Sequence, residues 1–170
     1  MIDRETTLLG FPIITNTKGA LIQIGKNCLI CSRSEQTALG VSHKTILRTL
    51  SPESNLIIGN FVRMSGTTIC SASSIKIGDR CVIGADVMIT DTDFHSLDHE
   101  IRSSKLDSKH AHSNPVIIGN DVFIGGKSII LKGVTLGNRV IVGAGSVVTR
   151  SFPDDSIIGG NPAKLIKTQS

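Results

Sequence analysis

A histidine preceded by two aspartates is the group best suited to chemistry in this sequence. Residues 90–95 place Asp91 and Asp93 just before His95. A histidine ring takes up and returns protons near neutral pH, so His95 could serve as a general base. Asp93 or Asp91 could fix the tautomer of that ring or hold a substrate hydroxyl. The structural alternatives are a surface loop histidine and turn-forming aspartates.

The cysteines do not form a metal-binding pattern. Cys28 and Cys31 have the spacing of a metal-binding pair, but no second such pair follows them. Cys70 and Cys81 lie eleven residues apart. Small thiols buried in an apolar core explain this distribution better than zinc does. We therefore expect no metal.

The elements that must position His95 repeat every six residues. The dipeptide aliphatic-Gly recurs along the chain, from Ile24-Gly25 to Val142-Gly143. The clearest run of aliphatic residues at every sixth position is Ile118, Ile124, Ile130, Leu136, Val142 and Val148. This period fits a short strand followed by a corner, with the aliphatic side chain pointing inward. The following Gly suits a tight or positive-φ corner.

Three such hexads make one triangular coil, and stacked coils bury a continuous core. The repeat predicts an all-β fold, a left-handed parallel β-helix of roughly five coils, as a single domain over residues 1–170. Regular coils are expected over about 20–153, with a less regular stretch at 33–54. Residues 154–170 are expected to form a C-terminal cap of turns with a short basic tail.

One stretch breaks the repeat completely. Residues 96–115 are polar and contain three histidines, and they predict a loop extruded from the coil. Long loops in compact domains are usually functional or disordered. His95 lies six residues after Ile89, at the next inward position, where the coil gives way to this loop.

Composition agrees with a narrow interior and excludes several partners. The chain has 17 Gly, five Phe and neither Trp nor Tyr, so β-branched residues must fill the core. Its net charge of +4 is scattered, without the concentrated basic face of a nucleic-acid-binding protein. Residues 1–16 are not typical of a signal peptide or a membrane span, which favours a cytoplasmic protein without membrane insertion.

Three segments carry a family resemblance. They are Ile118-Gly-Asn-Asp-Val-Phe-Ile-Gly-Gly, Gly143-Ala-Gly-Ser-Val-Val-Thr-Arg and Gly159-Gly-Asn-Pro-Ala-Lys. The chain resembles the hexapeptide-repeat acyltransferases over roughly residues 56–168, above all the maltose and galactoside O-acetyltransferases and the capsule or O-antigen O-acetyltransferases. The resemblance implies acetyl-CoA as donor, a sugar hydroxyl as acceptor, and a homotrimer with active sites between adjacent subunits.

The resemblance also implies a role for His95. It matches the family's catalytic histidine at the junction of coil and loop. His95 would take the hydroxyl proton while the oxygen attacks the thioester directly, and would later protonate the thiolate. A backbone N–H near Gly126 would stabilise the oxyanion.

Donor-binding residues follow from the same resemblance. Gly126, Ala144 and Thr149 match small residues that line the family's coenzyme A groove. Arg150 takes a position where the family often has Lys, and it would meet phosphate. Lys164 and Lys167 are the candidates for binding the 3′-phosphate of coenzyme A.

The acceptor side departs from the family. Met64 takes the place of an Asn that lies near the acceptor sugar in the maltose and galactoside group. Arg102, early in the loop, could touch the acceptor. The helical N-terminal segment of that group is not found here, which favours surface-polysaccharide or lipopolysaccharide biosynthesis as the context.

Three other functions compete with O-acetylation. A nucleotide-amino-sugar N-acetyltransferase would use the same donor and an amine acceptor. A γ-class carbonic anhydrase shares the fold but needs three metal-binding histidines, and the pairs His95–His99 and His110–His112 have the wrong spacing. A non-catalytic β-solenoid scaffold would explain the repeat but neither His95 nor the loop.

Overall fold

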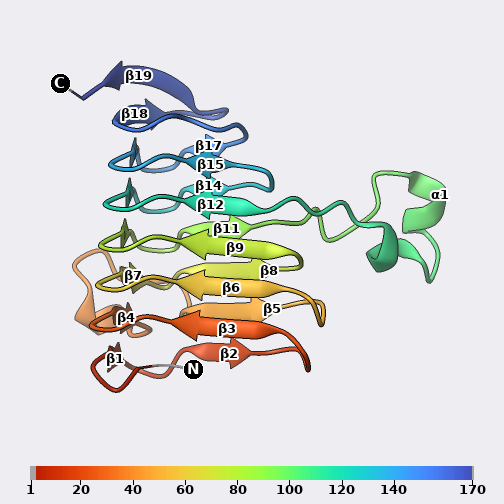
Figure 1. The fold of residues 1–170 in the computed structure, drawn as a ribbon, viewed down its shortest axis with the longest axis horizontal. Coiled ribbons are helices and arrows are strands. Elements are labelled where there is room, and N and C mark those ends of the chain that lie inside the picture. Colours follow the sequence, from red (N-terminus) through yellow and green to blue (C-terminus); the bar gives the residue numbers. More distant parts are fainter. Residues whose placement is uncertain (1–2, 170) are drawn as a thin grey trace.

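Three parallel sheets wind around one apolar interior, and each coil gives a short strand to each sheet. In the computed structural model, which describes residues 3–169, the stack of coils is a left-handed parallel β-helix (Figure 1). The predicted fold class is confirmed. Sheet A contains β1 (Thr7–Leu9), β4 (Leu29–Cys31), β7 (Arg63–Ser65), β10 (Val82–Ile83), β13 (Phe123–Ile124), β16 (Ile141–Val142), β18 (Ser156–Gly159) and β19 (Lys164–Thr168).

The other two sheets complete each coil. Sheet B contains β2 (Ile13–Thr15), β5 (Ile46–Thr49), β8 (Thr68–Ser71), β11 (Met88–Thr90), β14 (Ile129–Ile130) and β17 (Val147–Val148). Sheet C contains β3 (Leu21–Ile24), β6 (Asn55–Ile58), β9 (Ser74–Ile77), β12 (Val116–Ile118) and β15 (Thr135–Leu136). The chain passes from A to B to C, so it turns at an A–B, a B–C and a C–A corner.

Equivalent residues of successive coils stack in register and fill the core. Ile83 pairs with Ile124, and Ile124 pairs with Val142. These three side chains are 0–2% exposed. The residues four positions after the aliphatics of the repeat also point inward, and Val122, Ser128 and Val134 are 0–1% exposed. The hydroxyl of Ser128 donates to the carbonyl oxygen of Gly125 at 2.7 Å. The six-residue period therefore reflects one inward aliphatic residue for each side of the coil.

The corner glycines serve close stacking rather than positive φ. The positive φ angles belong instead to residues that lie two positions after a corner glycine, such as Asp86 at 57° and Lys127 at 59°. A Cβ on Gly78 would lie 2.6 Å from the carbonyl oxygen of Gly119 in the next coil. The predicted positive-φ role of these glycines is wrong, because it is contact between coils that excludes a side chain.

The stack is taller than the sequence predicts. Strands begin at residue 7 rather than about 20, and sheet A holds seven parallel strands before β19, against the roughly five coils expected. The first coil lacks most of the aliphatic-Gly signature, so its strands were missed. The predicted basic tail is β19, which pairs antiparallel with β18.

Two loops leave the coil, where the sequence predicts one. The predicted loop covers residues 91–115 between β11 and β12 and holds α1 (His99–Arg102) and the 3-10 helix η2 (Asp107–His110). A second loop, residues 32–45, joins β4 to β5 and holds the 3-10 helix η1 (Ser34–Gln36). The first leaves a B–C corner, at the right in Figure 1, and the second leaves an A–B corner, at the left. They lie at opposite edges of sheet B.

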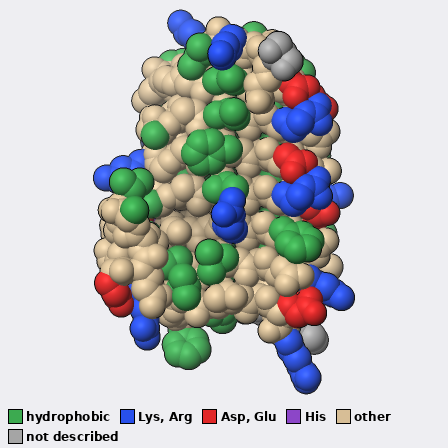
Figure 2. Space-filling model, turned by 90° about the vertical axis from the view of Figure 1, so that its left-hand side faces the viewer, with side chains coloured by type: hydrophobic (Ala, Val, Ile, Leu, Met, Phe, Trp, Pro, Cys, Tyr) green, Lys and Arg blue, Asp and Glu red, His purple; other side chains and the backbone are tan. Residues whose placement is uncertain are grey.

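The outer face of sheet A carries apolar side chains beside a charged edge (Figure 2). Phe123 is 45% exposed on this face. At the neighbouring C–A corners, Arg80 pairs with Asp121 at 2.7 Å and Arg139 with Asp155 at 2.6 Å. Each pair joins one coil to the next, although exposed pairs contribute little stability individually. Within residues 3–169 no helix is long and apolar enough to span a membrane.

Candidate active site

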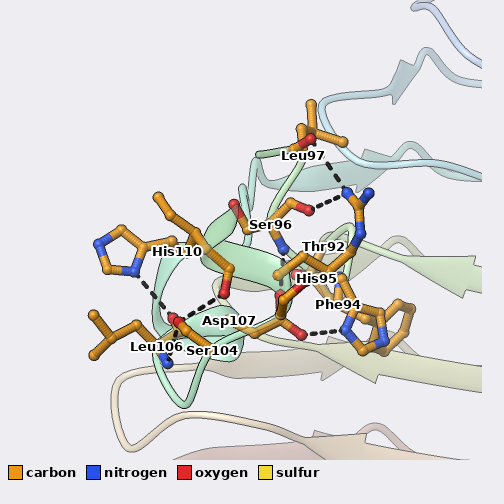
Figure 3. A network of polar contacts seen from close by, with 12 residues as sticks. Thr92, Phe94, His95, Ser96, Leu97, Ser104, Leu106, Asp107 and His110 are labelled. Atoms are coloured by element: carbon orange, nitrogen blue, oxygen red, sulfur yellow. Dashed lines mark hydrogen bonds and ion pairs between the residues drawn. The ribbon is translucent and has the colours of Figure 1, made fainter. Parts of the chain in front are cut away.

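His95 meets a carboxylate from the far side of its own loop. Its Nδ1 lies 2.6 Å from Oδ2 of Asp107 in η2, as Figure 3 shows. The other oxygen of Asp107 accepts the backbone N–H of Ser96 at 2.7 Å. The His95 side chain is 67% exposed, and Nε2 has no partner among the described residues. One ring nitrogen is therefore fixed while the other stays open to a ligand.

The rest of the loop holds this pair in place. The guanidinium of Arg102 donates to the carbonyl oxygens of Ser96 at 2.8 Å and Leu97 at 3.2 Å. Asp98 caps α1 by accepting the N–H groups of Glu100 and Ile101. The residues flanking His95 are thus tied to α1 and η2, although the loop is exposed.

Asp107 is held ionised. The hydrogen bond from His95, and then that from the Ser96 N–H, keep the pKa of the Asp107 carboxyl below its usual value. An ionised carboxylate only accepts hydrogen bonds, so Nδ1 of His95 carries the proton. In the neutral ring Nε2 then has a free lone pair, which is the state a general base requires.

Asp93 does not make the contact with His95 that the sequence allowed. Its Oδ1 pairs with Nζ of Lys132 at 2.9 Å, and its Oδ2 is buried without a partner among the described residues. Lys132 belongs to the next B–C corner, between β14 and β15. Asp93 therefore joins the base of the loop to the coil, and a catalytic role for it stays a prediction.

Asp91 cannot bind substrate as the sequence analysis suggested. It is fully buried, and its carboxylate accepts the N–H groups of Ala72 and Ser73 at 2.7 and 2.8 Å and the Ser71 hydroxyl at 3.0 Å. All three donors lie at the B–C corner of the preceding coil. Asp91 is thus a structural residue that fixes the coil below the loop.

Asp91→Asn should lower the free energy of unfolding by about 2 kcal/mol, because an amide NH₂ would face donors it cannot satisfy. Thermal unfolding of the variant and the parent protein measures this difference. The exposed Asp98→Asn should cost less, since the amide oxygen can still cap α1. Equal stability of Asp91→Asn and the parent protein would contradict the structural role.

The structure also corrects the second acceptor candidate, Met64. Met64 is 2% exposed and stacks in register between Ile30 and Ile83, so it belongs to the core. Its position on the inward aliphatic track explains why. Arg102 donates through Nη1 to the carbonyl oxygens of residues 96 and 97, and a contact between Arg102 and the acceptor stays a prediction.

Gly126 and Ala144 line a groove at the A–B corner, together with Ala85 from the coil below. This corner groove holds about 460 Å³, and its outer wall is formed by residues 34 and 39–42 of the second loop. The backbone N–H groups of Ala85, Gly126 and Ala144 donate no hydrogen bond within residues 3–169. A column of free donors beside small side chains suits a narrow ligand rich in amide oxygens.

The other predicted donor residues lie elsewhere. Thr149 and Arg150 follow β17 at a B–C corner, and the Arg150 guanidinium stacks 5.3 Å above the ring of Phe152. Lys164 and Lys167 are exposed on β19 at the C-terminal end of sheet A. Within one chain, the corner groove and these residues do not converge on His95.

All four cysteines are free and buried. Burial raises the pKa of the Cys81 thiol to about 11, and it also raises the pKa values of Cys28 and Cys70. Such thiols are poor nucleophiles and poor metal ligands at neutral pH. Among the described residues, no three His, Cys, Asp or Glu side chains are grouped so that they could hold a metal ion.

Known proteins share this coil and its sequence. The family model for the hexapeptide repeat of succinyl-transferase matches residues 65–91 and 115–150. Galactoside O-acetyltransferase of Escherichia coli K12 is 36% identical over 115 residues, covering 67% of this chain and 54% of the relative. WbbJ of the same strain, provisionally named a lipopolysaccharide biosynthesis O-acetyl transferase, is 39% identical over 103 residues, covering 58% and 53%. The alignments thus span about half the length of these curated relatives.

A solved hexapeptide-repeat acetyltransferase of Vibrio cholerae is 30% identical, with a TM-score of 0.60, over 71% of this chain and 69% of that chain. The chain belongs to the hexapeptide-repeat acetyltransferases. A second structure of the Vibrio cholerae protein contains acetyl coenzyme A; it is 27% identical, with a TM-score of 0.64, over 89% of this chain and 71% of that chain.

Asp107 is the residue of this hexapeptide-repeat acetyltransferase that sequence reasoning missed. It lies twelve residues after His95 in a polar stretch with no repeat to predict its position. Ala85 was missed as well, although its place after Ile83-Gly84 mirrors that of Gly126 after Ile124-Gly125. That equivalence would have identified the lower end of the groove.

Proposed function

We propose that this chain is an acetyl-CoA-dependent O-acetyltransferase that acts on a sugar hydroxyl, with His95 as general base. The observation that carries the proposal is the contact between His95 Nδ1 and Asp107, which leaves Nε2 free and exposed. Similarity to a galactoside O-acetyltransferase and to WbbJ supports a sugar acceptor in surface-polysaccharide or lipopolysaccharide biosynthesis.

The reaction needs no covalent intermediate. Nε2 of His95 takes the acceptor's hydroxyl proton while the oxygen attacks the thioester carbonyl carbon. The carbon–sulfur bond then breaks, and the protonated ring returns its proton to the departing thiolate. Between attack and departure of the thiolate, the carbonyl oxygen carries a negative charge that N–H donors must stabilise. A free N–H of the corner groove, such as that of Gly126, suits this role.

The donor fits along the corner groove. Its pantetheine arm would run past Ala144 and Gly126, where free N–H groups can pair with its amide oxygens. Its phosphates would lie toward the C-terminal end of the stack, where Lys164 and Lys167 are exposed. Binding therefore uses backbone donors for the arm and side-chain charge for the phosphates.

A complete site would need a second copy of the chain. His95 leaves the B–C side of sheet B, whereas the corner groove lies on the A–B side. We propose a homotrimer in which the His95 loop of one subunit faces the corner groove of the next. Exposed Phe123 and Leu165 on sheet A are apolar surface that such packing could cover. Four free thiols fit the reducing cytoplasm.

Calorimetric titration with CoA and acetyl-CoA tests the donor assignment. Saturable binding is expected, and Ala144→Phe should weaken it by more than about tenfold, because the ring would fill the groove. Thr135→Phe, on the outer face of sheet C, is the matched control and should bind normally. Absence of heat with either ligand would overturn the proposal. Thiol release with hydroxyl and amine sugars then separates O- from N-acetylation.

A further inference from the structure

The second loop is a fixed wall rather than a mobile flap. Its Ser42 donates a backbone N–H to Oδ1 of Asp86 at 2.9 Å and its hydroxyl to Oδ2 of the same carboxylate. Burial alone would raise the pKa of Asp86, but these bonds bring it below its usual value. The carboxylate therefore stays ionised and holds the loop against a corner two coils above its origin.

Packing fixes the loop at a second point. A Cβ on Gly66 would lie 2.7 Å from Cβ of Val41, so the loop approaches this corner only because Gly66 has no side chain. The backbone of Val41 is held as well, because its N–H donates to the hydroxyl of Ser34 at 3.2 Å. The part of the loop that lines the groove is thus anchored at residues 41 and 42.

The wall presents aliphatic surface to the groove. Leu39 and Val41 line it from the loop, and Ala85 and Ala144 line it from the coil. Leu39 is 85% exposed, an unusual position for a large aliphatic side chain on an anchored loop. The carboxylate of Asp86 is occupied by Ser42. An aliphatic ligand group would therefore cover apolar surface here without burying an unpaired charge.

The orientation of the proposed donor brings its acyl group to this wall. With its phosphates at the β19 end and its pantetheine arm along Ala144 and Gly126, the thioester lies at the lower end of the groove. That end is formed by Ala85 and the second loop. The group nearest the aliphatic wall is then the acyl chain of the thioester.

We propose that the corner groove accepts acyl chains longer than acetyl, and that Leu39 and Val41 are the specificity-determining residues that contact them. The inference rests on the proposed acyl-CoA donor and extends it from acetyl-CoA to short-chain acyl-CoA thioesters. The transfer chemistry is unchanged: the same ester bond forms, and the same carbon–sulfur bond breaks. Only the length of the transferred chain differs.

Calorimetric titration with CoA, acetyl-CoA, butyryl-CoA and octanoyl-CoA tests this inference without any acceptor. Each buried methylene should tighten binding by about fourfold, so butyryl-CoA, with two more methylenes, should bind roughly fifteenfold more tightly than acetyl-CoA. Octanoyl-CoA should gain little beyond butyryl-CoA, because its chain would pass the rim at Leu39.

Leu39→Ala should remove most of the advantage of butyryl-CoA, so that butyryl-CoA and acetyl-CoA bind the variant with similar affinity. Leu39 is exposed, so the variant should fold normally. Leu21→Ala is the matched control, because Leu21 is 43% exposed on sheet C, away from the groove. If CoA and acetyl-CoA bind but butyryl-CoA binds no more tightly, this inference fails and the donor assignment stands. If CoA itself does not bind, the proposed function fails.

Discussion

His95→Ala should lower kcat for acetyl transfer by about 10²- to 10⁴-fold, the range that general acid–base catalysis supplies. The alanine removes the ring that Asp107 holds through Nδ1, and with it the Nε2 atom that is proposed to take the hydroxyl proton. Affinity for CoA should change little, because backbone N–H groups of the corner groove, rather than His95, are proposed to hold the pantetheine arm. Thiol release with a sugar acceptor gives kcat, and calorimetry gives the CoA affinity.

His99→Ala is the matched control for this measurement. His99 is an exposed histidine of the same loop, in α1, and its side chain makes no hydrogen bond or ion pair with His95 or Asp107 within residues 3–169. Its substitution should leave turnover unchanged. A His95→Ala protein that turns over at the parental rate, while still binding CoA, would remove His95 as the base and leave the groove as the only assigned part of the site.

The coil could be predicted from the sequence because its core repeats one physical requirement. Each side of each coil needs one inward aliphatic residue, and Ile118 to Val148 meet this requirement six residues apart. The corner glycines were found because they recur with the same period. Their role in letting coils stack closely was not predicted. A Cβ on Gly84 would lie 2.5 Å from the backbone nitrogen of Gly126, and a contact between residues of different coils is not visible along a single strand.

The site was predictable only where it touches the repeat. His95 was found because it lies six residues after Ile89 where the repeat stops, but it belongs to the loop, and its side chain is 67% exposed rather than inward as predicted. Asp107 and Ser42 were not found, since each acts from a loop whose path is set by hydrogen bonds rather than by a period. Asp91 was misassigned because an aspartate four residues before the candidate base looks the same in sequence whether it faces substrate or the preceding corner.

Asp107→Asn should lower kcat by up to about 10⁴-fold, the loss seen when a carboxylate that sets a histidine tautomer becomes an amide. The amide can still accept the Ser96 N–H through its oxygen, so the loop keeps its shape. Its NH₂ group would then face Nδ1 of His95, and two donors cannot share that contact. The ring is expected to move its proton to Nε2, which removes the lone pair that the reaction needs.

Tautomer and turnover must therefore change together if Asp107 is a positioning residue. Nitrogen-15 NMR of histidine-labelled protein reports which ring nitrogen of His95 carries the proton, and calorimetry shows whether CoA still binds. Asp98→Asn is the matched control, because Asp98 caps α1 in the same loop without touching His95. Lost activity with an unchanged His95 tautomer would mean that Asp107 only supports the loop through Ser96. Lost activity with the proton moved to Nε2 is the result that the 2.6 Å contact predicts.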